Sequence, residues 1–286
     1  MTMPLVTRQV TNAATRSVLI TGCSSGIGLA CATVLKQRGW RVLATARKAA
    51  DLDRLRGLGF EVLNLELADA NTIEACASEA LRLTDRQLTA LINNAAYGQL
   101  GAVEDLTADV LRQQFEVNVI GTHDLTRRLI PAMRANRHGR IVQVSSVLGL
   151  MAAPYRGAYC ASKFALEALS DSLRLELQGS GIAVSLIEPG PVRTQFLANV
   201  LLAFRANIDA TSSVHQSVYA ERIAGIERGG KNAFKVEPEA VAKRAVHALE
   251  SPRPQPRYFV TVPTYAANVL RRVLPTVLLD RVARGQ

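Results

Sequence analysis

The sequence predicts an α/β protein with one doubly wound parallel sheet of about seven strands, and three observations support this. Short β-branched or leucine-rich runs alternate with helical patterns over most of the 286 residues. The runs are mostly uninterrupted by charge, as is typical of strands buried on both faces of a parallel sheet. Four polar motifs begin at or just past the ends of such runs, at Gly22, Asn93, Ser146 and Pro189. Because ligands bind beyond the carboxyl ends of parallel strands, these motifs are expected to form one site.

Helices are expected between successive strands, on both faces of the sheet. Strands are expected near residues 17–21, 41–45, 61–65, 90–93, 140–145 and 183–188. The two longest helical patterns cover residues 107–135 and 155–179. This alternation favours right-handed crossover connections. No Ser/Gly run, low-complexity block or internal repeat marks a linker, so residues 17–263 are expected to form a single domain.

The N-terminal segment, residues 1–16, is polar, threonine-rich and free of acidic side chains. It lacks the apolar core of a secretory signal, so a flexible lead-in is expected there. The chain has no run of about 18 apolar residues, and no membrane span is expected.

A long connection at residues 191–236 lacks a strand pattern and includes an apolar stretch at 200–204. Long connections in compact domains commonly form lids or binding loops. We therefore predict a helical lid, with a surface helical hairpin as the alternative. An apolar lid favours a lipophilic substrate.

The C-terminal segment, residues 264–286, places Leu270, Val273 and Val277 at helical spacing, with arginines nearby. This amphipathic tail should break or kink at Pro275. We expect the tail to dock on the protein. Closure of the substrate pocket and contact with an anionic membrane surface are the alternatives.

Composition narrows the possible partners and the cellular location. The net charge is +10, but no basic run is longer than two residues and no basic–aromatic pattern for base stacking occurs, so nucleic-acid binding is not expected. The four cysteines and four histidines show no metal-like spacing, so no metal site is expected. Unpaired thiols favour a reducing, cytoplasmic location.

A glycine-rich turn follows the first strand and opens a helical pattern. Residues 21–28 read Thr-Gly-Cys-Ser-Ser-Gly-Ile-Gly. In a dinucleotide site, Gly22 would permit the tight turn, Gly26 would let the backbone approach the pyrophosphate, and Gly28 would let the helix pack closely on the sheet. The free N–H groups of the helix N-terminus would bind the phosphates. We predict a Rossmann-type nucleotide site, with an ordinary glycine turn as the alternative.

The end of the second strand indicates which nucleotide binds. NAD sites usually have an acidic side chain there for the ribose 2′-hydroxyl. Here Arg47 and Lys48 follow the strand, and no Asp or Glu precedes Asp51. Arg47 is placed to bind a 2′-phosphate, with Lys48 adding a positive charge. We therefore predict NADP(H) over NAD(H), with a solvated basic turn as the alternative.

Three residues form a candidate group for carbonyl–alcohol chemistry. Tyr159 and Lys163 are four residues apart, so a helix places them on one face, and Ser146 ends a neighbouring strand. An ammonium beside a phenol favours the phenolate and should bring its pKa nearer to neutral pH. The serine hydroxyl could hold a carbonyl oxygen. The alternative is a tyrosine packed on a lysine stem on an exposed helix face.

With these motifs the chain resembles the short-chain dehydrogenase/reductase family, from about residue 17 to about residue 261. The resemblance rests on the glycine turn, Asn93-Asn94-Ala95-Ala96, Asn118-Val119-Ile120-Gly121, Ser145-Ser146, Tyr159 with Lys163, and residues 189–194 (Pro-Gly-Pro-Val-Arg-Thr). More narrowly, the chain is similar to bacterial NADP-dependent aldehyde reductases and to the branch of the family that contains retinol and hydroxysteroid dehydrogenases. Ala96 replaces the usual glycine, and Glu66 stands where the family commonly has Asp.

The resemblance implies specific roles. Ser146, Tyr159 and Lys163 would be catalytic, and Asn118 would hold a water that links Lys163 to solvent. The implied cofactor-binding residues are Gly22, Ser24, Ser25, Gly26, Ile27, Gly28, Arg47, Lys48, Glu66, Leu67, Asn94, Ala95, Tyr159, Lys163, Pro189, Val192 and Thr194. The expected substrate contacts are Ser146, Tyr97, Leu148, Tyr159 and Phe196.

The expected activity is NADPH-dependent reduction of lipophilic aldehydes, either medium or long-chain or retinal-like, to alcohols. A hydroxysteroid or retinol dehydrogenase is the alternative within the enzyme class. A non-catalytic NADPH-sensing regulator on the same fold is the alternative from another class. The long helices resemble those through which the family forms dimers and tetramers, so a homo-oligomer is expected.

Overall fold

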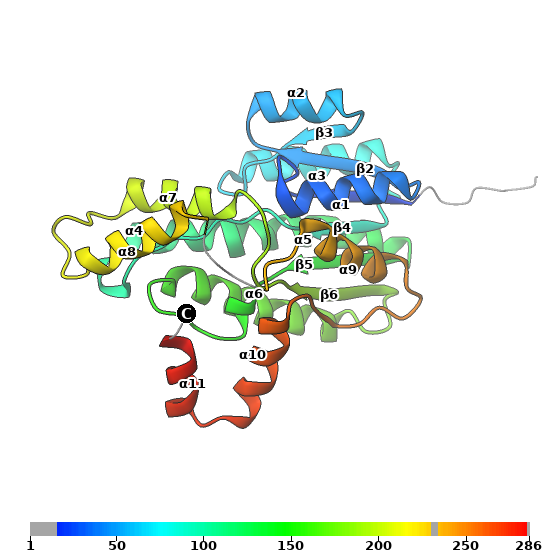
Figure 1. Cartoon of the computed structure of the whole chain (residues 1–286). Helices are drawn as coiled ribbons and strands as arrows, with labels where there is room; N and C mark the ends of the chain where they lie inside the picture. The colour runs from blue at the N-terminus through cyan, green and yellow to red at the C-terminus, as the bar shows by residue number, and fades with distance from the viewer. Residues whose placement is uncertain (1–15, 230–233, 285–286) are drawn as a thin grey trace, which may run out of the picture.

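The structure, a computed structural model, describes residues 16–229 and 234–284 and has one parallel sheet at its centre (Figure 1). The predicted lead-in lies outside the described residues except for Arg16. The seven strands are β1 (Ser17–Ile20), β2 (Arg41–Ala46), β3 (Glu61–Asn64), β4 (Ala90–Asn93), β5 (Gly139–Val144), β6 (Ile182–Glu188) and β7 (Arg257–Phe259). They are ordered β3-β2-β1-β4-β5-β6-β7, and every pair is parallel. The predicted doubly wound fold is confirmed.

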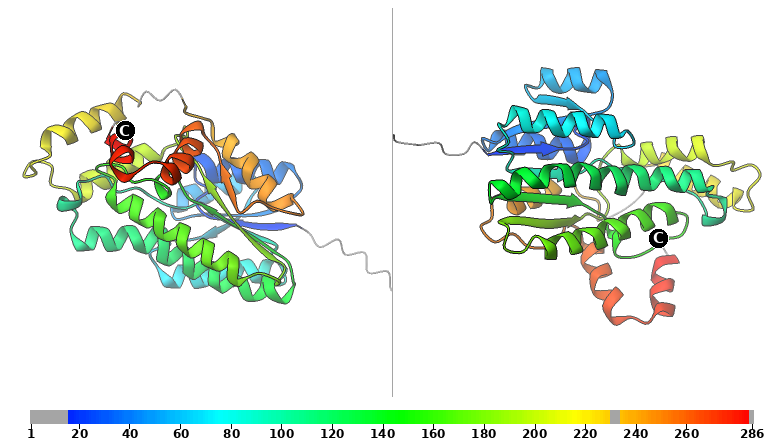
Figure 2. Two further views of the ribbon diagram at one scale, coloured as in Figure 1. Left: turned by 90° about the horizontal axis from the view of Figure 1, so that it is seen from below. Right: turned by 180° about the vertical axis from the view of Figure 1, so that it is seen from behind.

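Helices cover both faces of the sheet (Figure 2). The helices that pack on the sheet are α1 (Gly26–Gln37), α2 (Ala49–Gly57), α3 (Ala70–Leu83), α5 (Thr122–Ala135), α6 (Gly157–Glu176) and α9 (Pro238–Glu250). Side chains of α1, α2 and α9 form one core cluster with the sheet, and side chains of α3, α5 and the end of α6 form the other. Alternation along each strand produces the two clusters: Val18 and Ile20 belong to the first and Leu19 to the second.

The predicted helix over 107–135 is not regular. It consists of α4 (Ala108–Phe115), a π-helical turn η2 (Glu116–Gly121) and α5. Gly121 ends the π turn where it crosses the end of β3, and a Cβ there would lie 1.9 Å from the Leu67 carbonyl oxygen. Only glycine permits this approach, and π turns of this kind are frequent at functional sites.

The described part of the segment 191–236 is mainly helical, as expected. It contains α7 (Phe196–Asn207) and α8 (Gln216–Glu227), which extend beside α4 away from the sheet (Figure 1). The two helices share a core cluster with the chain after β4, formed by Leu100, Ala102, Val200, Phe204, Ile208 and Tyr219. Two backbone hydrogen bonds join the ends of the segment, Arg193 N to Val236 O at 2.9 Å and Val236 N to Pro191 O at 3.1 Å. Its role as a lid stays a prediction.

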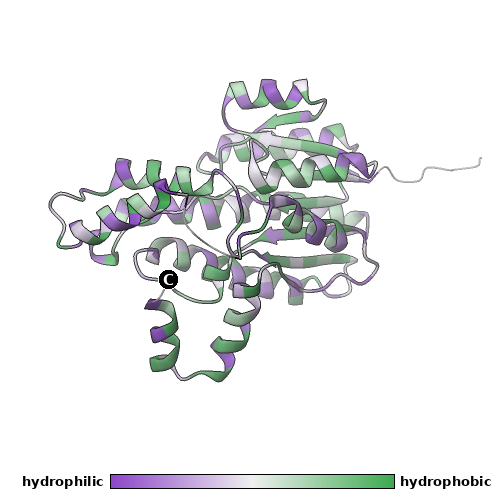
Figure 3. Cartoon of the chain, in the orientation of Figure 1, coloured by the Kyte–Doolittle hydropathy of each residue, from purple (hydrophilic) through white to green (hydrophobic). Residues whose placement is uncertain are grey.

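The tail forms two helices, α10 (Val262–Val273) and α11 (Thr276–Arg284), and the break at Pro275 is confirmed. Helix α10 docks on the protein by burying Thr264 and Ala267, whereas α11 has no buried residue. Both helices project from the body and mix apolar with charged residues (Figure 3). Contact of this surface with a membrane stays a prediction. None of the helices in residues 16–229 and 234–284 is long and apolar enough to cross a membrane.

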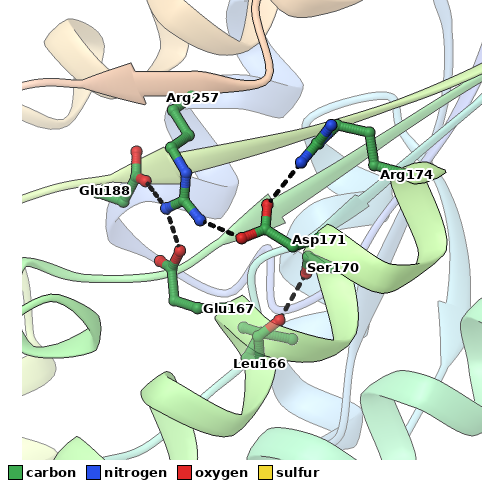
Figure 4. A network of polar contacts seen from close by, with 7 residues as sticks. All are labelled: Leu166, Glu167, Ser170, Asp171, Arg174, Glu188 and Arg257. Carbon is green, nitrogen blue, oxygen red and sulfur yellow. Dashed lines mark hydrogen bonds and ion pairs between the residues drawn. The ribbon is translucent and has the colours of Figure 1, made fainter.

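Arg257 anchors the last strand through three carboxylates (Figure 4). From β7 its guanidinium donates to Glu188 on β6 at 2.8 Å, to Asp171 on α6 at 2.6 Å, and to Glu167 on α6. The Glu188 side chain is 0% exposed and the Glu167 side chain 8% exposed. Burial, reinforced by the nearby Glu167 charge, raises the pKa of Glu188 to about 8. The network therefore holds a proton at neutral pH.

All four cysteines are free and buried. Their exposed fractions are 0% for Cys23, 1% for Cys31, 2% for Cys76 and 4% for Cys160. Burial raises the pKa of Cys23, Cys31 and Cys76 to about 12 and also raises that of Cys160. The thiols are therefore protonated and shielded from solvent.

Candidate active site

The glycine turn forms a cradle between β1 and α1. Gly22 and Gly26 have φ of +71° and +56°, in the left-handed region that favours glycine. A Cβ on Gly28 would lie 2.2 Å from the Gly22 carbonyl oxygen, so only glycine fits there as well. Helix α1 begins at Gly26 with no acidic residue in its first turn, and Ser25 makes no side-chain cap. The open N–H groups and the absence of Cβ atoms fit a pyrophosphate.

Asn94 and Thr21 hold this turn in place. The Asn94 side-chain nitrogen donates to the carbonyl oxygens of Thr21 at 2.9 Å and Gly22 at 3.1 Å. The Thr21 hydroxyl accepts from the backbone nitrogens of Asn94 and Ala95, both at 2.9 Å. Asn94 and Ala95 therefore lie beside the cradle, where the resemblance places the ribose. Thr21 was not predicted as a site residue. The available signal was its position as a threonine at the end of the first predicted strand.

Positive charge gathers at the end of β2 and the start of α2. Arg47 is exposed, and its guanidinium lies 3.5 Å from the Glu66 carboxylate, which follows β3. Arg54 on α2 donates to the carbonyl oxygen of Ser24 in the glycine turn. Arg54 was not predicted, because nothing in the sequence indicates that a residue one and a half turns into α2 contacts the turn after β1. Arg54 thus places a cation at Ser24, and Glu66 opposes the charge of Arg47.

Tyr159 and Lys163 lie buried on one face of α6, near the end of β5. The Lys163 Nζ donates to the Val144 carbonyl oxygen at 2.8 Å and lies 5.8 Å from the centre of the Tyr159 ring. Ser146 follows β5 and caps the short turn η3 (Val147–Gly149) by accepting from Leu148 N at 3.1 Å. The alternative of an exposed helix face is wrong, because Tyr159 is 9% and Lys163 3% exposed.

The pKa values of this pair differ from the expectation. Burial raises the Tyr159 pKa to about 12, and a hydrogen bond from Ser146 opposes this only in part. Burial also lowers the Lys163 pKa to about 8, although the charge of Glu167 acts to raise it. In the protein alone, loss of hydration therefore outweighs the attraction between ammonium and phenolate. The phenol is protonated at neutral pH, which is the form that a proton donor requires.

Asn118 lies within the π turn and is 1% exposed. Its side-chain oxygen accepts from Tyr97 N at 3.1 Å, and its nitrogen donates to Tyr97 O at 2.9 Å and to Ser162 Oγ at 3.1 Å. The amide thus ties the chain after β4 to α6, next to Lys163. The predicted water-holding role stays a prediction, and this amide already has three protein partners.

An apolar cluster covers the Tyr159 ring. Its members are Leu148, Tyr159 and Cys160, with Phe196 packed against them. The centres of the Tyr159 and Phe196 rings are 5.4 Å apart, and Phe196 also packs on the α7–α8 cluster. Buried apolar packing is therefore continuous from Tyr159 to the described part of the segment 191–236. Tyr97 is half-buried and attached to Asn118, and its hydroxyl has no hydrogen-bond partner among the described residues.

The remaining predicted residues lie along the same edge. A Cβ on Gly26 would lie 2.9 Å from Thr194 Cγ2, so the start of segment 191–236 touches the glycine turn. The Pro189 carbonyl oxygen accepts from Val147 N at 2.8 Å, which joins it to the turn after Ser146. Ile27 and Val192 pack on the first core cluster, and Leu67 is buried after β3. Lys48 caps α2.

The sequence of the chain is similar to those of known proteins. The sequence profile described as "short chain dehydrogenase" matches residues 16–203. "Uncharacterized oxidoreductase YbbO" of Escherichia coli (strain K12) is 44% identical over 270 residues, covering 94% of each chain. "17-beta-hydroxysteroid dehydrogenase type 1" of Homo sapiens is 37% identical over 256 residues, covering 85% of this chain and 77% of that protein.

A solved structure agrees with these sequence matches. The short-chain dehydrogenase from Streptomyces avermitilis is 29% identical, with a TM-score of 0.73, and the match covers 93% of each chain. The profile and the relatives match over most of the chain, and the fold agrees with that of the solved structure. The chain belongs to the short-chain dehydrogenase family of oxidoreductases.

Proposed function

We propose that this oxidoreductase reduces lipophilic aldehydes, either medium or long-chain or retinal-like, to alcohols with NADPH. The observation that carries the proposal is the buried Tyr159 ring, which lies 5.8 Å from Lys163 Nζ and packs with Leu148 and Phe196. A polar group for one carbonyl oxygen and an apolar cover for the rest of the molecule suit an apolar carbonyl compound.

Tyr159 is the proposed proton donor. Bound NADPH would supply the hydride to the carbonyl carbon. As the carbonyl oxygen gains negative charge, the Ser146 hydroxyl donates a hydrogen bond to it, which stabilises charge where it develops. Tyr159 then gives its proton to that oxygen, and the alcohol is formed.

Lys163 and Asn118 restore the phenol. A charged Lys163 favours the transient phenolate, and its pKa of about 8 lets it pass a proton on at near-neutral pH. A water held beside Asn118 would connect the amine to solvent.

Two alternatives remain. Turnover of a hydroxysteroid or retinol is favoured by the similarity to the human 17-beta-hydroxysteroid dehydrogenase. A non-catalytic NADPH-sensing regulator is less favoured, because Tyr159 and Lys163 are both present and buried together.

The test is NADPH oxidation, followed by absorbance, with aldehydes from C6 to C12, retinal and a panel of ketosteroids. We expect kcat/KM to rise with aldehyde chain length and to exceed that for ketosteroids. Higher kcat/KM for a steroid would favour the first alternative, and no oxidation with any panel would favour the regulator.

We also propose that Arg47 selects NADP(H). Arg47→Gln should weaken NADP⁺ binding by roughly tenfold to a hundredfold, because a charge-assisted hydrogen bond to the 2′-phosphate is lost. NAD⁺ binding should change little. Titration calorimetry with both nucleotides measures this without turnover. The control is Arg56→Gln on α2, whose side chain is exposed and paired with Asp53. Equal weakening of both nucleotides would contradict the role.

A further inference from the structure

Two arginines lie together where α8 meets the start of α6. Arg222 on α8 places its Cζ 4.7 Å from the centre of the Tyr155 ring. Arg156 follows Tyr155 and is the residue immediately before α6. Tyr155 has a φ of +64°, an uncommon conformation for a residue other than glycine, and its carbonyl oxygen accepts from Gly101 N at 2.9 Å. The backbone that carries Arg156 is therefore held in a defined position.

Arg156 also lies next to the proposed proton donor. It precedes Tyr159 by three residues, a spacing that places both on one side of the helix start. Burial lowers the pKa of Arg156, and the positive charge of Arg222 lowers it further. The positive charge of Arg156 in turn acts to lower the pKa of Tyr159. Arg156 therefore lies between Arg222, which contacts the adjacent Tyr155 ring, and Tyr159, which is three residues further along the chain.

Neither arginine is neutralised by the protein. Within residues 16–229 and 234–284, neither side chain forms a hydrogen bond or an ion pair, and Arg222 makes only the ring contact with Tyr155. Nearby carboxylates already have partners: Glu104 pairs with His215 at 2.6 Å, and Asp105 accepts from Ser213 at 2.6 Å and from Tyr219. Two adjacent, partly buried cations without an anion are unfavourable.

An anion from outside the chain would relieve this repulsion. Arg156 precedes Tyr159 by three residues and Arg222 contacts the Tyr155 ring, so a molecule with its carbonyl at Tyr159 can place a charged end at the arginines. We propose that Arg156 and Arg222 form a subsite for an anionic group of the substrate, a carboxylate or a group of similar charge. The substrate class thus becomes apolar carbonyl compounds with an anionic end. This inference rests on the proposed reduction.

The test compares oxo-carboxylates with their methyl esters, which have the same chain and differ in charge. For ω-oxo acids of four to twelve carbons, we expect the acid to have the higher kcat/KM at one optimal length. Arg156→Gln and Arg222→Gln should each lower kcat/KM for that acid by roughly tenfold to a hundredfold. In Arg222→Gln the ester should change less than threefold, which corresponds to less than about 0.65 kcal/mol.

Arg205→Gln is the matched control, because Arg205 lies on α7 and is exposed and paired with Glu227 at 2.8 Å. It should leave the ratio of acid to ester unchanged. Equal kcat/KM for acid and ester in the wild type, or an unchanged ratio in both subsite variants, would overturn the subsite while leaving the proposed reduction in place.

A binding measurement separates this inference from the proposed reaction. Decanoate, which cannot be reduced under these conditions, should bind to the NADP⁺-loaded protein by titration calorimetry, and each subsite variant should weaken that binding. Binding that depends on the arginines without turnover of any carbonyl would support the subsite and reject the aldehyde reduction. Decanoate binding that is unaffected in folded variants, as judged by their melting temperatures, would reject the subsite.

Discussion

Tyr159→Phe should lower kcat for carbonyl reduction by about 10²–10⁴-fold, the usual contribution of a positioned general acid. The hydroxyl is the only group of this side chain that can donate a proton. The ring should stay in place, because it packs on Leu148 and Phe196 and is 9% exposed. NADP⁺ affinity and melting temperature should therefore stay near the wild-type values. Single-turnover kinetics with saturating NADPH measure the chemical step directly.

Tyr265→Phe is the control for removal of a phenol hydroxyl. Tyr265 lies on α10 and is 49% exposed, and its side chain has a 3.5 Å contact from Arg244 to its oxygen and a ring contact with Phe259. Its kcat should equal that of the wild type. A Tyr159→Phe enzyme that reduces aldehydes at a near-normal rate would remove the proposed proton donor.

Arg257→Met should lower the free energy of unfolding by roughly 3–5 kcal/mol, as expected when one member of a buried ion network is lost. The substitution leaves Glu167, Glu188 and Asp171 without their shared cation. The loss should be greatest at about pH 9, where all three carboxylates are charged. It should shrink toward pH 5, because protonation removes the repulsion. Urea unfolding at several pH values measures the difference.

The wild-type protein should show a pH dependence with the opposite sign to that of most carboxylates. The Glu188 pKa is about 8 in the folded protein and near 4.5 when unfolded. Between these values the folded state holds a proton that the unfolded state has lost, so stability rises as pH falls from about 8 to about 4.5. Glu188→Gln should remove this slope, because an amide does not titrate.

Arg253→Met is the control for arginine removal, since Arg253 is exposed and its side chain has no ion pair with the described residues. It should change stability by less than about 0.5 kcal/mol. An Arg257→Met protein that is as stable as the wild type at pH 9 would show that the three carboxylates tolerate one another without the arginine. The dependence of wild-type stability on pH would then have to arise from other titrating groups.

The positions of the strands followed from periodicity because buried parallel strands are the most distinctive pattern in the chain. The predicted run at 90–93 matches β4 (Ala90–Asn93), and the other five predicted strands agree to within one residue at each end. The π turn at Glu116–Gly121 was not predicted, since an i→i+5 turn leaves little trace in a helical hydrophobic pattern. The break at Pro275 was predicted, because proline cannot continue the hydrogen-bond ladder of a helix.

The positions of the candidate site residues were predicted better than their electrostatics. The motifs at Gly22, Ser146 and Pro189 do lie at one sheet edge, because all strands are parallel and their carboxyl ends meet there. The Tyr159 pKa was predicted with the wrong sign, because spacing reveals a neighbouring ammonium but not the degree of burial. The Arg156–Arg222 pair was missed for a similar reason, since its members are distant in sequence and meet only through the fold.

The four buried thiols supply chemical reporters that need no engineered label. They report on three parts of the molecule: Cys23 and Cys31 lie in the first core cluster, Cys76 lies on α3 across the sheet, and Cys160 lies beside Tyr159. Alkylation requires the thiolate, so each site reacts only when its surroundings open to water. Mass spectrometry of alkylated peptides would therefore separate a local opening, which modifies Cys160 alone, from complete unfolding, which modifies all four together.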